Sequence, residues 1–175
     1  MEGVTAVSEY GVIKLVHLGA LVFWLGPALG AWWVLRTVEN GSYARGSVAE
    51  KVSRVFYRTV IVEHVAFIVL LVTGFLMATQ YGLMGAEWVR QKLAIVLLVV
   101  VPLEIVDVIL GNWVASTASS KLYAGKPLSP WEKRGLSLYH GAFTKVALLV
   151  IPLSVLIIMY LATSKAALPV STVMP

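Results

Sequence analysis

The sequence predicts an all-α integral membrane protein, a bundle of four transmembrane helices. Hydrophobic residues make up 59% of its 175 residues and charged residues only 13%. Soluble domains have about 45–50% apolar and about 25% charged residues. Four apolar runs are long enough to cross a bilayer, which takes about 20 residues in a helix. We expect residues 1–175 to form a single transmembrane domain in a lipid bilayer.

The four predicted spans are separated by polar segments. The spans cover residues 11–36, 56–79, 88–113 and 136–163. Segments 38–54 and 115–133 are polar or rich in Ser, Gly and Pro, so they are predicted to be loops. Pro27, Pro102 and Pro152 each remove a backbone donor within a span. We therefore expect bends near these three positions.

The positive charges are concentrated in the two longer loops and at their edges. These residues are Arg36, Arg45, Lys51, Arg54, Arg58, Lys121, Lys126, Lys133 and Arg134. The positive-inside rule then puts both termini on the non-cytoplasmic side of an inner or plasma membrane. The net charge of +5 is interpreted as a sign of orientation, and no nucleic-acid partner is expected. Glu2 and Glu9 occupy the region where a cleavable signal is cationic, so no signal peptide is predicted.

Two carboxylates lie inside the third predicted span. Glu104 and Asp107 are three residues apart, which puts them on one face of a helix. A carboxylate at the centre of a span costs roughly 2.5–3.5 kcal/mol on insertion scales. We therefore expect both to point into the bundle, toward the second or fourth span, where protein, water or a ligand can satisfy them.

The polar groups of the spans sort into two levels when depth is counted at ~1.5 Å per residue. The outer, non-cytoplasmic level contains His17, Met77, Lys92 and Met159. The inner level contains Glu63, His64, Glu104, Asp107 and Lys145, with His140 nearer the inner surface.

At the outer level, His17 has two interpretations. It can be an axial haem ligand, since neutral imidazole suits iron and small neighbours leave room for a porphyrin, or a histidine hydrogen-bonded between helices. Lys92 can pair with a haem propionate or act as a catalytic cation, or it can extend to the membrane interface.

At the inner level, Glu63, His64, Glu104, Asp107 and His140 also leave two alternatives open. Their nitrogen and oxygen atoms are of the kind that bind zinc, iron or copper, and His64 and His140 are candidate ligands of a second haem. Alternatively, they form a buried network neutralised by Lys145 and Arg58. The candidate metal ligands of the whole chain are thus His17, His64, Glu104, Asp107 and His140. The absence of cysteine excludes thiolate sites, iron–sulfur clusters and covalently attached haem.

Three short motifs carry a resemblance to a known family. The first span reads His17-LGALVF-Trp24-Leu25-Gly26, the second ends in Thr73-Gly74, and the third opens with Trp88-VRQ-Lys92-Leu93. This pattern resembles the superfamily of HemJ-type protoporphyrinogen oxidases, the CopD copper-resistance domain and related four-helix membrane proteins. The resemblance covers all four spans loosely.

This resemblance implies a bound haem b. HemJ proteins are membrane b-haem proteins in which a first-helix His and a third-helix Lys are important, and these match His17 and Lys92. HemJ proteins usually carry Leu-Pro-Arg soon after the Trp-x-Gly, whereas this chain reads PALGAWWVLR there. Glu104 and Asp107 match no family position that we identify.

Three hypotheses follow. The first is a haem-b redox protein, either an electron-transport subunit or an oxidase of a quinol or porphyrin-like substrate. The second is a metal-handling membrane protein, most simply for copper, with Met77, Met84 and Met159 as soft ligands. The third is a non-catalytic subunit of a larger membrane complex, and a homo-oligomer or such a complex is the expected setting for all three.

Overall fold

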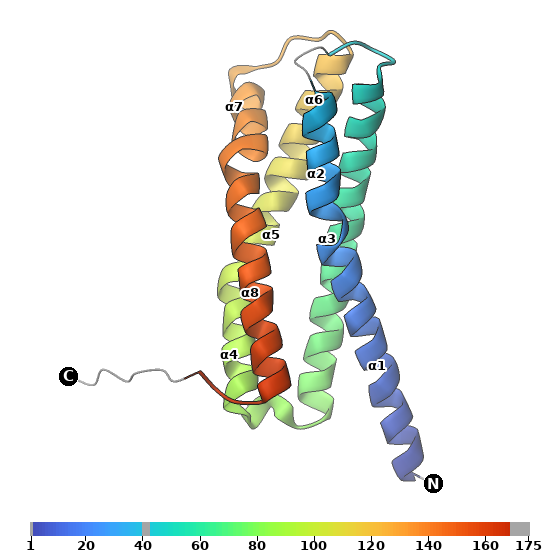
Figure 1. Ribbon diagram of the computed structural model, residues 1–175, viewed down its shortest axis with the longest axis vertical. Coiled ribbons are helices and arrows are strands. Elements are labelled where there is room, and N and C mark those ends of the chain that lie inside the picture. Colours follow the sequence, from blue (N-terminus) through green and yellow to red (C-terminus); the bar gives the residue numbers. More distant parts are fainter. Residues whose placement is uncertain (1, 40–42, 169–175) are drawn as a thin grey trace, which may run out of the picture.

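The computed structural model describes residues 2–39 and 43–168, and every regular element within them is helical (Figure 1). The first span contains α1 (Glu2–Leu25) and α2 (Pro27–Val38), and the second is α3 (Val48–Gln80). A 3-10 turn, η1 (Leu83–Gly85), leads to the third, made of α4 (Glu87–Ile95), η2 (Val96–Val100), α5 (Val101–Asp107), η3 (Val108–Ala115) and α6 (Ser116–Tyr123). The fourth comprises α7 (Pro130–Leu138), η4 (Tyr139–Phe143) and α8 (Thr144–Ser164).

Among the described residues, four continuous helical stretches are long and apolar enough to cross a membrane. They are Glu9–Val38, Val48–Gln80, Glu87–Tyr123 and Pro130–Ser164. Large apolar side chains cover their outer surface, with Leu15, Leu98 and Leu149 at least 70% exposed. An apolar surface of this extent is what lipid covers. The predicted all-α class with four spans is confirmed, and the chain is a multi-pass membrane protein.

The helices extend beyond the predicted spans into segments predicted to be loops. α3 begins at Val48, and the third helical stretch continues to Tyr123. At the start of α3, the Ser47 hydroxyl accepts a hydrogen bond from the backbone N–H of Glu50 at 3.1 Å. At the start of α7, Ser129 and Glu132 form a reciprocal capping box. Such caps stabilise a helix end by about 1 kcal/mol, so these helices begin in polar sequence outside the apolar runs.

The first span is interrupted at Gly26, next to one of the three prolines. α1 ends at Leu25, and α2 starts with Pro27 at a position where its missing N–H is tolerated. The predicted bend near Pro27 is therefore observed at Gly26, whose backbone stays helical and whose N–H still donates to the carbonyl of Val22 at 2.9 Å. Pro102 lies in the first turn of α5, just after the π-helical segment η2, whereas Pro152 lies inside α8.

Helix α1 begins and helix α8 ends at the same end of the bundle. Figure 1 shows the first turns of α1, the last turns of α8 and the turn containing η1 at that end, with the connections before α3 and α7 at the other. Two clusters of buried side chains hold the bundle together. One is centred on Trp24 and Phe67, and the other on Phe56 and Tyr139. A cavity lies beside each cluster.

Candidate functional site

The outer cavity has a volume of about 640 Å³ and lies between α1, α3, α4 and α8. Ligand pockets in proteins measure about 300–1,000 Å³. The four residues predicted for the outer level, His17, Met77, Lys92 and Met159, all line it. Among the lining side chains, those of Leu18, Phe75 and Met159 are also exposed on the outer surface of the bundle. An amphipathic ligand can therefore reach this cavity from the lipid side.

His17 is held in a defined tautomer by Thr73 of α3. The Nδ1 atom of His17 lies 2.9 Å from Oγ1 of Thr73. The Thr73 hydroxyl has one proton, and it donates that proton to the carbonyl of Val69 at 2.6 Å or of Leu70 at 3.2 Å. Its oxygen must therefore accept from His17, which assigns the imidazole proton to Nδ1. The Nε2 atom is left with a free lone pair.

Gly74 makes room for this imidazole ring. A Cβ atom built at Gly74 would lie 3.0 Å from Cε1 and 3.6 Å from Nδ1 of His17. The first distance is shorter than ordinary carbon–carbon contact, about 3.5–4.0 Å. The Thr73-Gly74 pair therefore both binds the ring and lets it pack directly against α3.

The outer cavity is lined by cations and by no carboxylates. Lys14, Lys92 and Lys165 line it, and none of the three forms an ion pair among the side chains that the structure describes, those of residues 9–27, 30–39 and 43–168. Ammonium groups bind carboxylates and phosphates through charge-assisted hydrogen bonds. The cavity thus suits a large apolar ligand that has anionic groups and one atom requiring a nitrogen donor.

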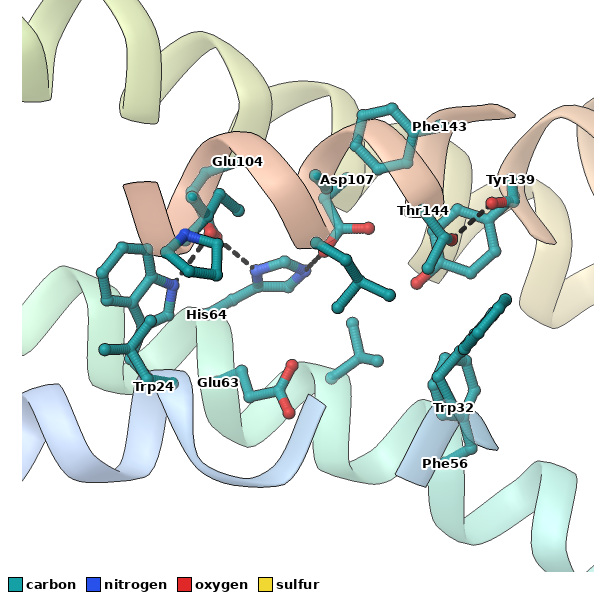
Figure 2. Close-up of a pocket in the computed structure, with 16 residues that line it drawn as sticks. Trp24, Trp32, Phe56, Glu63, His64, Glu104, Asp107, Tyr139, Phe143 and Thr144 are labelled. Atoms are coloured by element: carbon teal, nitrogen blue, oxygen red, sulfur yellow. Dashed lines mark hydrogen bonds and ion pairs between the residues drawn. The ribbon is translucent and has the colours of Figure 1, made fainter. Parts of the chain in front are cut away.

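The inner cavity is smaller, about 310 Å³, and carries the opposite charge. Glu63 and His64 reach it from α3, and Glu104 and Asp107 from α5 (Figure 2). Trp24 lines both cavities. Two of the three π-helical segments, η3 and η4, adjoin this region; π-segments are frequent at functional sites.

Glu104 is fully engaged by its neighbours. The indole Nε1 of Trp24 donates to Oε1 of Glu104 at 2.8 Å, and Nδ1 of His64 lies 3.0 Å from Oε2. Asp107 lies farther away, with Oδ2 3.9 Å from Nε2 of His64, which is too long for a hydrogen bond. The prediction that both carboxylates point into the bundle toward the second or fourth span is confirmed, and the residue they approach is His64 of the second span.

Glu63 has no such partner. Only 6% of the residue is exposed, and its Oε1 atom is buried without a hydrogen-bond partner among the described residues. Figure 2 shows its carboxylate pointing into the space between α3 and the α5 residues. Nε2 of His64 likewise lacks a hydrogen bond. Two polar groups of this cavity are therefore available to a ligand.

His140 lies apart from both cavities. Its Nε2 atom is 3.0 Å from the hydroxyl of Tyr57, which is also 3.2 Å from Oγ of Ser119. His64 and His140, the candidate ligands of a second haem, thus belong to separate groups of side chains. Lys145 and Arg58, expected to neutralise the inner network, are instead exposed and form no ion pair in the described part of the chain.

The five candidate metal ligands are accordingly divided among three places. His17 is in the outer cavity, His140 is beside Tyr57, and the other three surround the inner cavity. Among residues 9–27, 30–39 and 43–168, no three His, Cys, Asp or Glu side chains are grouped closely enough to hold a metal ion. Of the candidates, His17 and His64 each combine a cavity with a free ring nitrogen, and the cavity of His17 is about twice as large.

Sequence reasoning did not assign roles to several residues of these sites. Thr73 and Trp24 stand in the quoted motifs, but their partners His17 and Glu104 could not be named from spacing alone. The aromatic lining of the inner cavity from Trp32, Phe56, Tyr139 and Phe143 also had no sequence signal. Tyr139 packs so tightly on η3 that a Cβ at Gly111 would lie 2.7 Å from its hydroxyl.

The fold and the two cavities define a class: a four-span helical membrane protein with one cavity lined by lysine side chains and a second lined by carboxyl groups. In comparisons with protein-family models, with curated proteins and with solved structures, no match to this chain was found. Its function is therefore inferred from the chemistry of the cavities.

Proposed function

We propose that this chain is a haem-b-binding membrane redox protein and that the haem occupies the outer cavity. The observation that carries the proposal is the hydrogen bond between His17 and Thr73, which leaves Nε2 of a half-buried imidazole free. Histidines that bind metals nearly always donate their other N–H to a neighbouring acceptor, which fixes the ring. The resemblance of the His17 and Lys92 motifs to HemJ proteins supports the same assignment.

The residues that line the outer cavity fit a haem group. The cavity has the size of a ligand pocket, Gly74 leaves the space that the imidazole needs, and Lys14, Lys92 and Lys165 complement two propionates. Bound haem supplies reversible one-electron chemistry, with a potential set by the axial ligand, burial and neighbouring charge. His17 orients and holds the group, and Lys92 faces a propionate or the substrate. The role is electron transfer or oxidation of a quinol or porphyrin-like substrate.

The absorption spectrum of the purified protein tests this proposal. We expect a Soret band, non-covalent haem b by pyridine haemochrome analysis, and about one haem per chain. The strictest form of this test uses protein produced with added haem precursor, and hemin is then titrated into any sites that remain empty. A preparation that shows no Soret band and no saturable hemin binding contradicts the proposal.

A second candidate is copper handling, because one cavity brings His17, Met77 and Met159 together. Imidazole and thioether are ligands that Cu(I) accepts. Metal analysis distinguishes the candidates, since copper without porphyrin favours this alternative. Met84 does not line the cavity, so the predicted set of three methionines is reduced to two.

The orientation also belongs to this proposal. Arg36, Arg54, Lys121 and Lys133 lie in or beside the connections before α3 and α7. The positive-inside rule assigns that end to the cytoplasm and the outer cavity to the opposite side of an inner or plasma membrane. There the haem protein works as a homo-oligomer or as part of a larger membrane complex.

A further inference from the structure

We propose that the inner cavity binds a lipophilic organic ammonium ion, held by Glu63 and by the aromatic rings around it. This site is separate from the outer cavity and does not depend on haem. Trp24 lies between the two, because it lines both. Three features of the inner cavity carry the proposal: its charge, one unpartnered carboxylate, and its aromatic walls.

The lining residues have an excess of negative charge. Glu63, Glu104 and Asp107 supply three carboxyl groups, whereas no Lys or Arg lines the cavity. His64 is the only basic side chain in the lining, and it contacts Glu104 at 3.0 Å. Even with His64 protonated, the lining has two more acidic side chains than basic ones, so in this region of low dielectric an added cation is strongly attracted to each carboxyl group that is ionised.

Glu63 marks where that cation binds. Glu104 is satisfied by Trp24 and His64, but Oε1 of Glu63 is buried and unpartnered. An unpaired buried carboxylate is costly, so such a group either takes up a proton or stays ionised beside a cation that pairs with it. Figure 2 shows the Glu63 carboxylate directed at the open space of the cavity.

The walls fit an organic cation better than a metal ion. Trp24, Trp32, Phe56, Tyr139 and Phe143 line the cavity, together with aliphatic side chains such as Leu148 and Ile151. Ring faces attract charge-diffuse ammonium groups through cation–π interactions. A metal ion needs several close ligands, and the described residues include no group of three suitable side chains. At about 310 Å³ the cavity matches a small ligand with one apolar substituent.

The test is calorimetric titration of benzyltrimethylammonium into the purified full-length chain in detergent, with empty micelles as the blank. We expect saturable binding of one cation per chain. Neopentylbenzene, which has carbon in place of the charged nitrogen, should give no saturable heat. Glu63→Gln should weaken binding at least about tenfold by removing the charge. Trp32→Leu should weaken it roughly threefold or more.

Matched controls keep the result decisive. Glu87→Gln changes an exposed carboxylate beside Arg90, far along the chain from the cavity, and should bind the cation like the wild type. Glu63→Asp keeps the charge and should retain most of the binding; Glu63→Ala, which also removes the charge, replaces Glu63→Gln if that variant fails to fold. The proposal is overturned if binding does not saturate, if neopentylbenzene binds equally well, or if the variant without the Glu63 charge titrates like Glu87→Gln.

Discussion

The imidazole of His17 hydrogen-bonds through Nδ1 to the hydroxyl of Thr73 at 2.9 Å, across the contact between α1 and α3. The Thr73 proton is directed to a backbone carbonyl of its own helix, so the bond has one direction. One short contact thus fixes the orientation and tautomer of a histidine inside a membrane span. This contact is the reason why we propose His17 as a haem ligand and not as a residue that only packs between helices.

Replacing Thr73 with valine should weaken haem binding about 10–100-fold, because losing the partner of a metal-binding histidine typically has that effect. The valine keeps the shape of the side chain and removes only the hydroxyl. Hemin titration of the detergent-purified apoprotein measures the change. Thr79→Val is the matched control on α3, since the Thr79 hydroxyl bonds only to carbonyls of its own exposed turn. Equal affinity in both variants would show that Thr73 does not support the ligand.

Replacing Lys92 with alanine should leave haem bound but lower its midpoint potential. The Lys92 ammonium lines the cavity, and a nearby positive charge favours the reduced, less positive iron. Potentiometric titration of the Soret and α bands measures the shift. Lys126→Ala, in the exposed connection between α6 and α7, provides a control with the same loss of charge. Equal midpoint potentials in the two variants would show that the Lys92 charge does not act on the haem.

Replacing Trp24 with phenylalanine should destabilise the bundle by roughly 1–3 kcal/mol, since it leaves buried Oε1 of Glu104 without its donor. Reversible unfolding in detergent, followed by circular dichroism, measures the loss. Trp33→Phe makes the same change at a side chain that is 60% exposed, and it should be nearly neutral. A Trp24 variant as stable as the Trp33 variant would mean that the Trp24–Glu104 bond contributes little.

The proposed orientation can be tested by single-cysteine labelling, because the chain has no cysteine of its own. Ala44 and Gly85 are exposed at opposite ends of the bundle. An impermeant maleimide added to intact cells should label Gly85→Cys and should label Ala44→Cys only after permeabilisation. The reverse pattern would put both termini in the cytoplasm.

The sequence predicted the features that depend on composition and depth, and it missed those that depend on helix rotation. Apolar runs located all four spans, and counting residues put His17 and Lys92 at one level. The Thr73–His17 and Trp24–Glu104 bonds require knowing which helices pack and at what angle, which spacing within one helix does not specify. For the same reason Lys145 was expected to pair with the carboxylates, although it faces outward.

One structural feature that was not predicted nevertheless has a recognisable sequence pattern. Ser129 followed by Glu132 is a capping-box pattern, so the start of α7 at Pro130 could have been predicted before the apolar run. The partnership of His140 with Tyr57 could not, because those residues are far apart in sequence and lie on different helices.

The haem content of His17→Ala tests the central claim most directly. His17→Ala, His64→Ala and His140→Ala should be purified alongside the wild type and their haem per chain determined by pyridine haemochrome. The account predicts that His17→Ala loses nearly all of its haem, whereas the other two keep theirs. Full haem with an unchanged spectrum in His17→Ala, or loss of haem only in the His64 or His140 variant, would contradict it.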